Sequence, residues 1–322
     1  MVPPMLITAV GLVFAVLNGT NDGGALVAAS LKAQGIRPLT AIAVLSVCLG
    51  VVPLVVGLRV AETLAGGLVP AEPEQQRVLL LSAVAVAVLV VGLLNLRGLP
   101  TSLTLALVGG IVGGGLGAGL PVAWGLVGVT ALLGVAAPTL GGVIARFLRN
   151  VPLLTSRRRF ESPRVAKGHG FSFGAQAIAY AANDGQKIYA VLGAGAVTAT
   201  AAPDLPSWLF AAVPVLFAIG AALGVRRAAR TLSGGGVLRT RPRDEVAAEL
   251  SSALTVLGSA AVGVPVSMTQ AVAGSLIGAG MRRGTHQVRW RAAARLAMAW
   301  VLTLPASVAV GAGLAVVGGV GR

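Results

Sequence analysis

Long apolar runs, separated by short polar or glycine-rich stretches, recur along the whole chain. Within a bilayer only helices and closed barrels satisfy their own backbone hydrogen bonds, and a helix needs about 20 apolar residues to cross it. The pattern therefore predicts an all-α polytopic membrane protein. We place its membrane spans at residues 4–31, 38–59, 77–96, 99–119, 121–146, 169–199, 207–225, 246–263, 265–281 and 291–319.

Composition and charge agree with a membrane protein. Of the 322 residues 56% are hydrophobic and 11% are charged, whereas soluble domains carry about 25% charged residues. The net charge of +15 could suggest a nucleic-acid surface, but the basic residues gather in alternate loops, above all 146–167, 226–243 and 282–295. The positive-inside rule places these loops in the cytoplasm and the N-terminus outside. We therefore expect a multi-pass protein of the cell (inner) membrane, with the lipid bilayer and not nucleic acid as its partner.

Two motifs occur twice in the chain, in the same order. "LNGTNDGG" at 17–24 is matched by "YAANDGQK" at 180–187, and "PTSLTLALVGGIVGGGL" at 100–116 by "PVSMTQAVAGSLIGAG" at 265–280. We interpret this as a duplication: repeat 1 at 1–150, a basic cytoplasmic loop at 151–168, and repeat 2 at 169–322 with a cytoplasmic linker at 226–245. Five spans per repeat is an odd number, so repeat 2 enters the membrane inverted, as in many secondary transporters.

The Asn–Asp motifs place the only two acidic residues deep in spans, Asp22 and Asp184. An ionised Asp at the bilayer centre costs roughly 3 kcal/mol on insertion scales, so it needs a partner or a use. The glycines around the first motif predict that the helix breaks there. Carboxylates alone suit H⁺, and together with the amide oxygens of Asn21 and Asn183 they suit Na⁺. The simpler alternative is a polar pair that joins two helices.

The proline motifs are typical of the start of a half-helix. Pro100 and Pro265 fit a first helical turn, and two facing helix N-termini favour an anion. The simpler alternative is that the hydroxyls bond back to their own backbone. The hydroxyls that would face the anion are those of Ser102, Thr104, Ser267 and Thr269.

Anion donors beside two carboxylates require charge compensation, because a dianion near two carboxylates is repelled. Bound cations or protons would supply it, which predicts cation-coupled anion transport. Lys187 lies one turn after Asp184 and either pairs with it or meets the anion. Glu249 begins an apolar run, where its position favours a loop-edge charge over a proton carrier. His169 and His286 fall in basic loops, where we expect no special role.

These motifs resemble those of the inorganic phosphate transporter (PiT) family. "NGTND" and "AANDGQK" look like its Asn–Asp signatures, "PTSLT" and "PVSMTQ" like its Pro-x-Ser-x-Thr motifs, and "AELSSALTV" and "RLAMAWVLTLP" are also similar. The resemblance implies phosphate symport with H⁺ or Na⁺ by alternating access, with the phosphate carried alone or as a metal complex. It also raises Glu249 from a loop charge to a candidate coupling residue.

Motifs and resemblance together give the predicted site. The residues predicted to bind the coupling cation are Asp22, Asp184 and Glu249. If that cation is Na⁺, its predicted ligands are Asp22, Asn21, Asp184 and Asn183. Beyond the coupling cation, no cofactor is expected. The residues predicted to bind substrate are Asn21, Thr101, Ser102, Thr104, Asn183, Lys187, Ser267, Thr269 and Gln270.

Several alternatives stay open at this point. The anion could be sulfate or another tetrahedral oxyanion, and an anion channel is a further option. An intramembrane enzyme with an Asp22–Asp184 dyad is disfavoured, because a dyad does not need a duplicated half-helix; we therefore expect no enzyme. The second span has only Ser46 and Cys48 as polar candidates, and Leu105 stands where the family often has His or Gln, which leaves the coupling ion undecided. The oligomeric state is also open, with a homodimer among the options.

Overall fold

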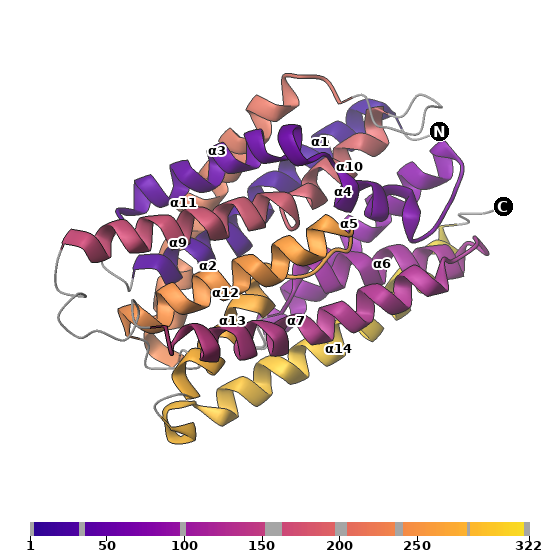
Figure 1. Ribbon diagram of the computed structural model, residues 1–322. Helices are drawn as coiled ribbons and strands as arrows, with labels where there is room; N and C mark the ends of the chain where they lie inside the picture. The colour runs from indigo at the N-terminus through magenta and orange to yellow at the C-terminus, as the bar shows by residue number, and fades with distance from the viewer. Residues whose placement is uncertain are drawn as a thin grey trace.

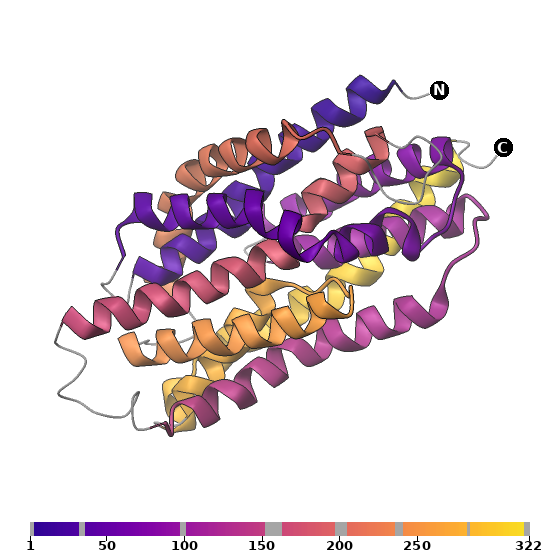
Figure 2. The same cartoon turned by 45° about the horizontal axis from the view of Figure 1, so that its top comes forward.

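The computed structural model describes residues 3–31, 36–96, 101–151, 163–196, 205–235, 241–281 and 284–318, and these contain helices and no β-strand. Figures 1 and 2 show the helices lying side by side in one bundle, with the start of α1 and the end of α14 at the same end. The first half comprises α1 (Pro4–Asn18), η1 (Gly19–Gly23), α2 (Gly24–Ser30), α3 (Pro38–Val56), α4 (Arg59–Glu62), η3 (Thr63–Gly67), α5 (Pro73–Leu96), α6 (Leu103–Gly117) and α7 (Trp124–Leu148). The second half comprises α9 (Pro163–Ala182), α10 (Gln186–Ala196), α11 (Leu209–Gly235), α12 (Pro242–Ala261), α13 (Met268–Met281), η5 (Thr285–Gln287) and α14 (Trp290–Val317).

Six helical stretches among the described residues are long and apolar enough to cross a membrane. They are Met5–Ser30, Pro38–Val56, Pro73–Leu94, Trp124–Leu148, Leu209–Arg226 and Trp290–Val317. The predicted all-α polytopic membrane protein is thereby confirmed. The other four predicted spans correspond to α6, α13, α12 and the pair α9–α10. With 15 and 14 residues, α6 and α13 are about 22 Å long, short of the roughly 30 Å hydrocarbon core.

The packing of the two halves is reciprocal. The motif offsets pair α5 with α12, α6 with α13, and α7 with α14. In the structure α6 packs against α14 and α5, while α13 packs against α7 and α12. Thus α6 contacts α14, and their counterparts in the other half, α13 and α7, contact each other in the same way. This exchange is what a two-fold relation between repeats requires, and it supports the duplication; the inverted orientation stays a prediction.

Small residues allow the close helix contacts that span the two halves. A Cβ atom on Gly109 would lie 2.8 Å from the carbonyl oxygen of Leu304, and one on Gly113 would overlap the carbonyl of Val308. In α13 the same holds for Gly274 against the Pro138 carbonyl of α7. Without a hydrophobic drive between helices in lipid, this backbone approach is a main source of association. The glycines of α6 therefore serve helix packing.

Two predicted loop boundaries are wrong, because helices extend into both loops. The helix α9 begins at Pro163, inside the predicted loop 151–168, and α11 runs to Gly235, so only 236–241 separate it from α12. Asp244 explains the early start of α12. Its carboxylate accepts a hydrogen bond from the Arg241 amide at 3.1 Å and pairs with the Arg149 Nε of α7 at 3.1 Å.

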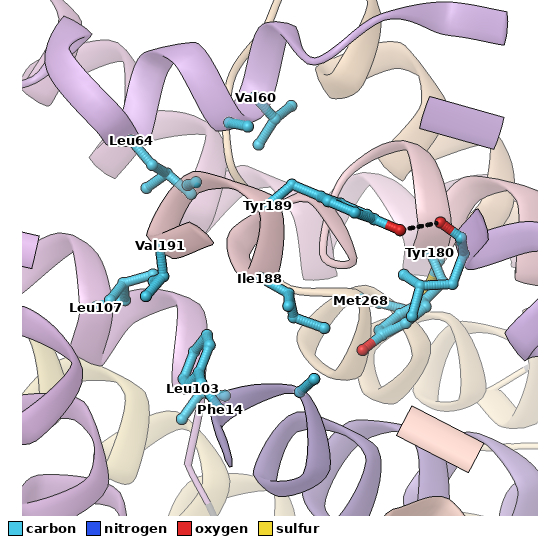
Figure 3. Packing of buried hydrophobic residues seen from close by; sticks show 14 of the residues in the cluster. Phe14, Val60, Leu64, Leu103, Leu107, Tyr180, Ile188, Tyr189, Val191 and Met268 are labelled. Atoms are coloured by element: carbon cyan, nitrogen blue, oxygen red, sulfur yellow. Dashed lines mark hydrogen bonds between the residues drawn. The ribbon is translucent and has the colours of Figure 1, made fainter. Parts of the chain in front are cut away.

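The main hydrophobic core lies where the short helices α4, η3, α6, α10 and α13 pack together. Figure 3 shows side chains of α4, η3, α6, α9, α10 and α13 packed together. Tyr180 and Tyr189 are the largest fully buried side chains of this cluster. Because both hydroxyls are buried, each needs an acceptor: Tyr189 donates to the Leu49 carbonyl at 3.0 Å, and Tyr180 donates to Asn18 Oδ1 at 2.9 Å. These bonds tie the second half of the chain to α3 and α1 of the first half.

Candidate functional site

The first Asn–Asp motif lies in a helix that does not break. Residues Gly19–Gly23 widen into a π-helical turn between α1 and α2, and the backbone stays helical throughout. The predicted break is therefore wrong here. The glycines serve contact with α11 instead, because a Cβ atom on Gly19 would overlap the Phe217 carbonyl and one on Gly24 would lie 2.8 Å from the Gly224 backbone.

The second Asn–Asp motif does interrupt its helix. The helix α9 ends at Ala182, a turn covers 183–185, and α10 starts at Gln186. Asn183 holds the segment between α12 and α13: its amide nitrogen donates to Ser259 Oγ and to the Val264 carbonyl, both at 2.9 Å, and its Oδ1 accepts from the Val266 amide at 3.0 Å. Asn183 thereby positions the start of α13.

The centre of the site is a buried cluster around Asp184. Its Oδ2 accepts a hydrogen bond from the Met268 amide at 2.6 Å, and its Oδ1 accepts from Thr104 Oγ1 at 3.0 Å. Met268 begins α13, and Thr104 lies in the first turn of α6. The two half-helix N-termini therefore converge on one carboxylate, as the proline motifs predict. Met268 was not named as a site residue, although the helix N-terminus predicted at the second proline motif implies backbone donors there.

A single lysine links the two acidic residues. Lys187 Nζ lies 2.5 Å from Asp184 Oδ1, 3.4 Å from Asp22 Oδ2 and 2.8 Å from Thr104 Oγ1. Asp22, Asp184 and Lys187 are exposed by 3%, 1% and 1% respectively. Asn21 donates to the other oxygen of Asp22 at 2.7 Å. The structure thus unites Asp22, Asp184, Lys187 and Thr104, four residues predicted separately.

The remaining predicted hydroxyls lie close by but are engaged locally. Ser102 caps α6 by accepting from the Leu105 amide at 3.2 Å, and Ser267 shares a hydrogen bond with Thr269 at 2.9 Å. Thr101 contacts Thr303 of α14 instead. Gln270 is buried, and its Oε1 has no partner among the described residues.

The proline of the second motif lies before its helix and not in the first helical turn. Two residues, Val266 and Ser267, lie between Pro265 and the start of α13 at Met268, so the predicted place of Pro265 in the first turn is wrong. Ser267, the residue that precedes the helix, takes the capping position. Pro100 lies outside the described residues.

Glu249 and His169 form a second buried polar cluster, which corrects two predictions. His169 is not in a loop but in α9, fully buried, with its Nε2 3.0 Å from Glu249 Oε1. Glu249 is 5% exposed and is not a loop-edge charge; its other oxygen accepts from Ser172. The spacing of His169, Ser172 and Gln176 on one helical face could have indicated this buried stripe. His286 is exposed in η5, as expected of a loop residue.

Gln186 is a buried residue beside the site that the sequence analysis did not single out. Its Oε1 accepts from the amides of Val60 and Ala61 at 3.0 and 3.1 Å, and its Nε2 donates to the Gly57 carbonyl at 3.0 Å. Gln186 therefore caps the N-terminus of α4, which no side chain of its own segment caps. This attaches the 57–61 segment to the start of α10, next to Lys187.

Charge and hydrogen bonding define what the cluster can do. Two carboxylates and one ammonium, all buried, leave a net charge of −1 when ionised. A buried charge is retained only where partners satisfy it, and here one lysine serves two carboxylates. The cluster can bind cations at its oxygen atoms. It can receive an oxyanion through Lys187, the Thr104 hydroxyl and the α13 amide once their present acceptor is neutralised.

Comparison with known proteins gives a consistent result. The model of the phosphate transporter family matches residues 18–167 and 155–311. The chain is 34% identical over 325 residues to a probable low-affinity inorganic phosphate transporter of Mycobacterium bovis, covering 96% of this chain and 76% of the relative. It is 26% identical over 321 residues to a protein of the same description from Bacillus subtilis, covering 96% and 95%. A solved structure, described as the sodium-dependent phosphate transporter, is similar in fold, with a TM-score of 0.77, 20% identity and 98% coverage of both chains.

Proposed function

The chain belongs to the phosphate transporter family, and we propose that it imports inorganic phosphate by symport with H⁺ or Na⁺, through alternating access. Its relatives are transporters, which excludes the enzyme alternative. The observation that carries the proposal is the cluster of Asp22, Asp184, Lys187 and Thr104 at the start of α13. It combines, in one buried place, groups for a cation and groups for an oxyanion.

The arrangement explains why the anion needs a cation. The donors that suit phosphate are Lys187, Thr104 and the Met268 amide, and all three now bond to Asp184. A phosphate dianion that approaches them is repelled by the net negative charge of the cluster. A cation or proton that neutralises the carboxylates removes the repulsion and frees these donors. Because charge-assisted hydrogen bonds are roughly twice as strong as neutral ones, cation and anion stabilise each other in the site.

The choice of anion follows from the same groups. Hydrogenphosphate carries a proton at neutral pH and can donate a hydrogen bond to Asp22 or Asp184, whereas sulfate cannot. This favours phosphate over sulfate or another fully ionised oxyanion, which stays the second candidate. Transport of a metal–phosphate complex fits the same charge argument, because a divalent metal would neutralise both carboxylates. By the positive-inside rule we expect the basic loops on the cytoplasmic side of the cell membrane, so import would move phosphate toward that side.

Uptake into proteoliposomes tests the function. Radiolabelled phosphate should accumulate above equilibrium when a proton or sodium gradient is imposed, and an excess of sulfate should compete weakly. Asp22→Asn and Asp184→Asn should each abolish accumulation, while Glu74→Gln, at an exposed helix start, should not. Full accumulation in both aspartate variants would contradict the site, and uptake that never exceeds equilibrium under either gradient would favour a channel.

A further inference from the structure

The surroundings of the Lys187 ammonium resemble a cation site. The Lys187 side chain is 1% exposed. Its Nζ contacts three oxygen atoms: one of Asp184 at 2.5 Å, one of Thr104 at 2.8 Å and one of Asp22 at 3.4 Å. These oxygens come from three separate parts of the chain: the turn after α9, the first turn of α6 and the π-helical turn η1. An ammonium has three N–H donors, so the three oxygens match its capacity.

The same three oxygens would suit a small hard cation. Carboxylate and hydroxyl oxygens are the ligands that such ions prefer, and here they converge on one point because helices from both halves meet there. The ammonium is a compact point charge on a flexible stem, so it replaces such an ion without changing the oxygen set. A tethered cation also does not depend on the ion concentration in solution, because its local concentration is fixed by the chain.

The first half of the chain has no equivalent lysine. The offset between Asn21 and Asn183 places Ala25 at the position that corresponds to Lys187, and Gly24 at that of Gln186. A lysine on both sides would give each carboxylate its own partner. The single lysine instead serves both Asp22 and Asp184, as an ion shared between the two halves would.

We propose that the Lys187 ammonium occupies the place of a coupling cation between Asp22, Asp184 and Thr104, so that the wild-type protein needs no Na⁺ there and H⁺ drives its transport. This rests on the proposed phosphate symport and narrows its coupling ion. Removal of the lysine opens a site of two carboxylates and one hydroxyl, and the variant then takes up Na⁺ in its place.

The test compares uptake by Lys187→Ala and the wild type in sodium and in choline buffer. Wild-type phosphate uptake, driven by a proton gradient, should be the same in both. Uptake by Lys187→Ala should fall at least about tenfold in choline, since two buried carboxylates lose their partner. NaCl should restore part of it, because Na⁺ replaces the positive charge but not the N–H donors of Lys187. Arg77→Ala, which removes a charge paired with Glu74 near the start of α5, is the matched control and should show no sodium dependence. Wild-type uptake that stops in choline would overturn the proposal, as would a folded Lys187→Ala with equal uptake in both buffers.

Thermal unfolding of the purified proteins gives a readout that does not require transport. NaCl should raise the Tm of Lys187→Ala by several degrees, because a ligand that binds only the folded state stabilises it, and should leave the wild type unchanged. Lys187→Gln, which keeps most of the side-chain volume, should respond in the same direction. If neither variant can be recovered folded even in NaCl, sodium does not fill the site and the proposal is wrong. If the wild type transports no phosphate under any gradient, the proposed function fails, while the Tm comparison still decides the sodium site.

Discussion

In the first Asn–Asp motif the helix continues through Asn21 and Asp22, whereas in the second the chain leaves the helix at Asn183 and resumes it at Gln186. The letters Asn-Asp-Gly are common to both. The difference lies in their surroundings: the first is packed against α11 through glycines, and the second is held by side-chain bonds to the α12–α13 segment and to residues 57–61.

The comparison shows how two copies of one motif acquire different tasks. The π-helical turn inserts an extra residue into the helix without breaking it, which directs Asp22 inward while α2 continues along α11. The break at Asn183 exposes backbone groups and brings Asp184 to the N-terminus of α13. One copy delivers a carboxylate from a packed helix; the other organises the site around it.

The largest effect is expected from neutralising the two carboxylates. Asp184 accepts from Met268, Thr104 and Lys187, whereas Asp22 has Lys187 at 3.4 Å and its neighbour Asn21. Removing one partner of a buried ion pair costs about 3–5 kcal/mol, and Asp184→Asn should approach this range. Asp22→Asn should cost clearly less, although both lose accumulation. Thermal unfolding in detergent measures the loss of stability in each variant. Equal losses would mean that the two carboxylates contribute equally to stability.

A smaller effect is expected from the glycines. In Gly19→Ala the new methyl group overlaps a backbone carbonyl of α11, so the helices must separate, at a cost of about 3 kcal/mol. In Gly185→Ala the new methyl meets the end of the Leu49 side chain, which can rotate away. We expect a much lower Tm for Gly19→Ala and a modest decrease for Gly185→Ala. The reverse order would show that the first motif is not primarily a packing surface.

The two asparagines should differ next. Asn183→Ala leaves the Val266 amide and the Val264 carbonyl without their buried partner, at about 2 kcal/mol. Asn21→Ala removes one bond to Asp22 on a half-buried residue and should change stability little. Limited proteolysis of the 262–267 segment should accelerate in Asn183→Ala alone. Unchanged proteolysis would remove Asn183 from its positioning role.

The smallest effect concerns the contact between the motifs. Tyr180 and Asn18 each lie three residues before their Asn, so their 2.9 Å bond joins equivalent positions of the two halves. Tyr180→Phe deletes this bond and should lower stability by about 1 kcal/mol, with phosphate uptake close to that of the wild type. A complete loss of uptake would instead give the hydroxyl a direct role in the site.

The elements of the fold were predictable where one physical rule dominates. Hydrophobic length locates the helices, and the repeated motifs reveal which positions correspond. The proline motifs predicted that two helix N-termini meet at an anion site, but the hydrogen bond between Thr104 and Asp184 was not predicted. The state of the first motif could not be predicted, because a glycine that loosens a helix and a glycine that admits a neighbouring helix look identical in sequence. Only the presence of Gly220 and Gly224 on α11 decides between them.

Hydrogen bonds between side chains far apart in the sequence also could not be predicted. His169 and Glu249 are 80 residues apart, and each alone resembles an ordinary charge at the edge of a loop. Gln186 contacts a segment more than a hundred residues away. Such bonds depend on how α9, α12 and α4 pack, which no local pattern encodes.

The polar stripe on α9 and α12 has a consequence for how the protein is made. His169 and Gln176 on α9 find their partners, Glu249 and Ser252, only on a helix synthesised much later. A polar helix surface partitions poorly from the translocon into lipid by itself, and neither α9 nor α12 is among the six helical stretches apolar enough to span a membrane. We therefore expect the second half to insert cooperatively, with α9 and α12 entering the bilayer as a pair.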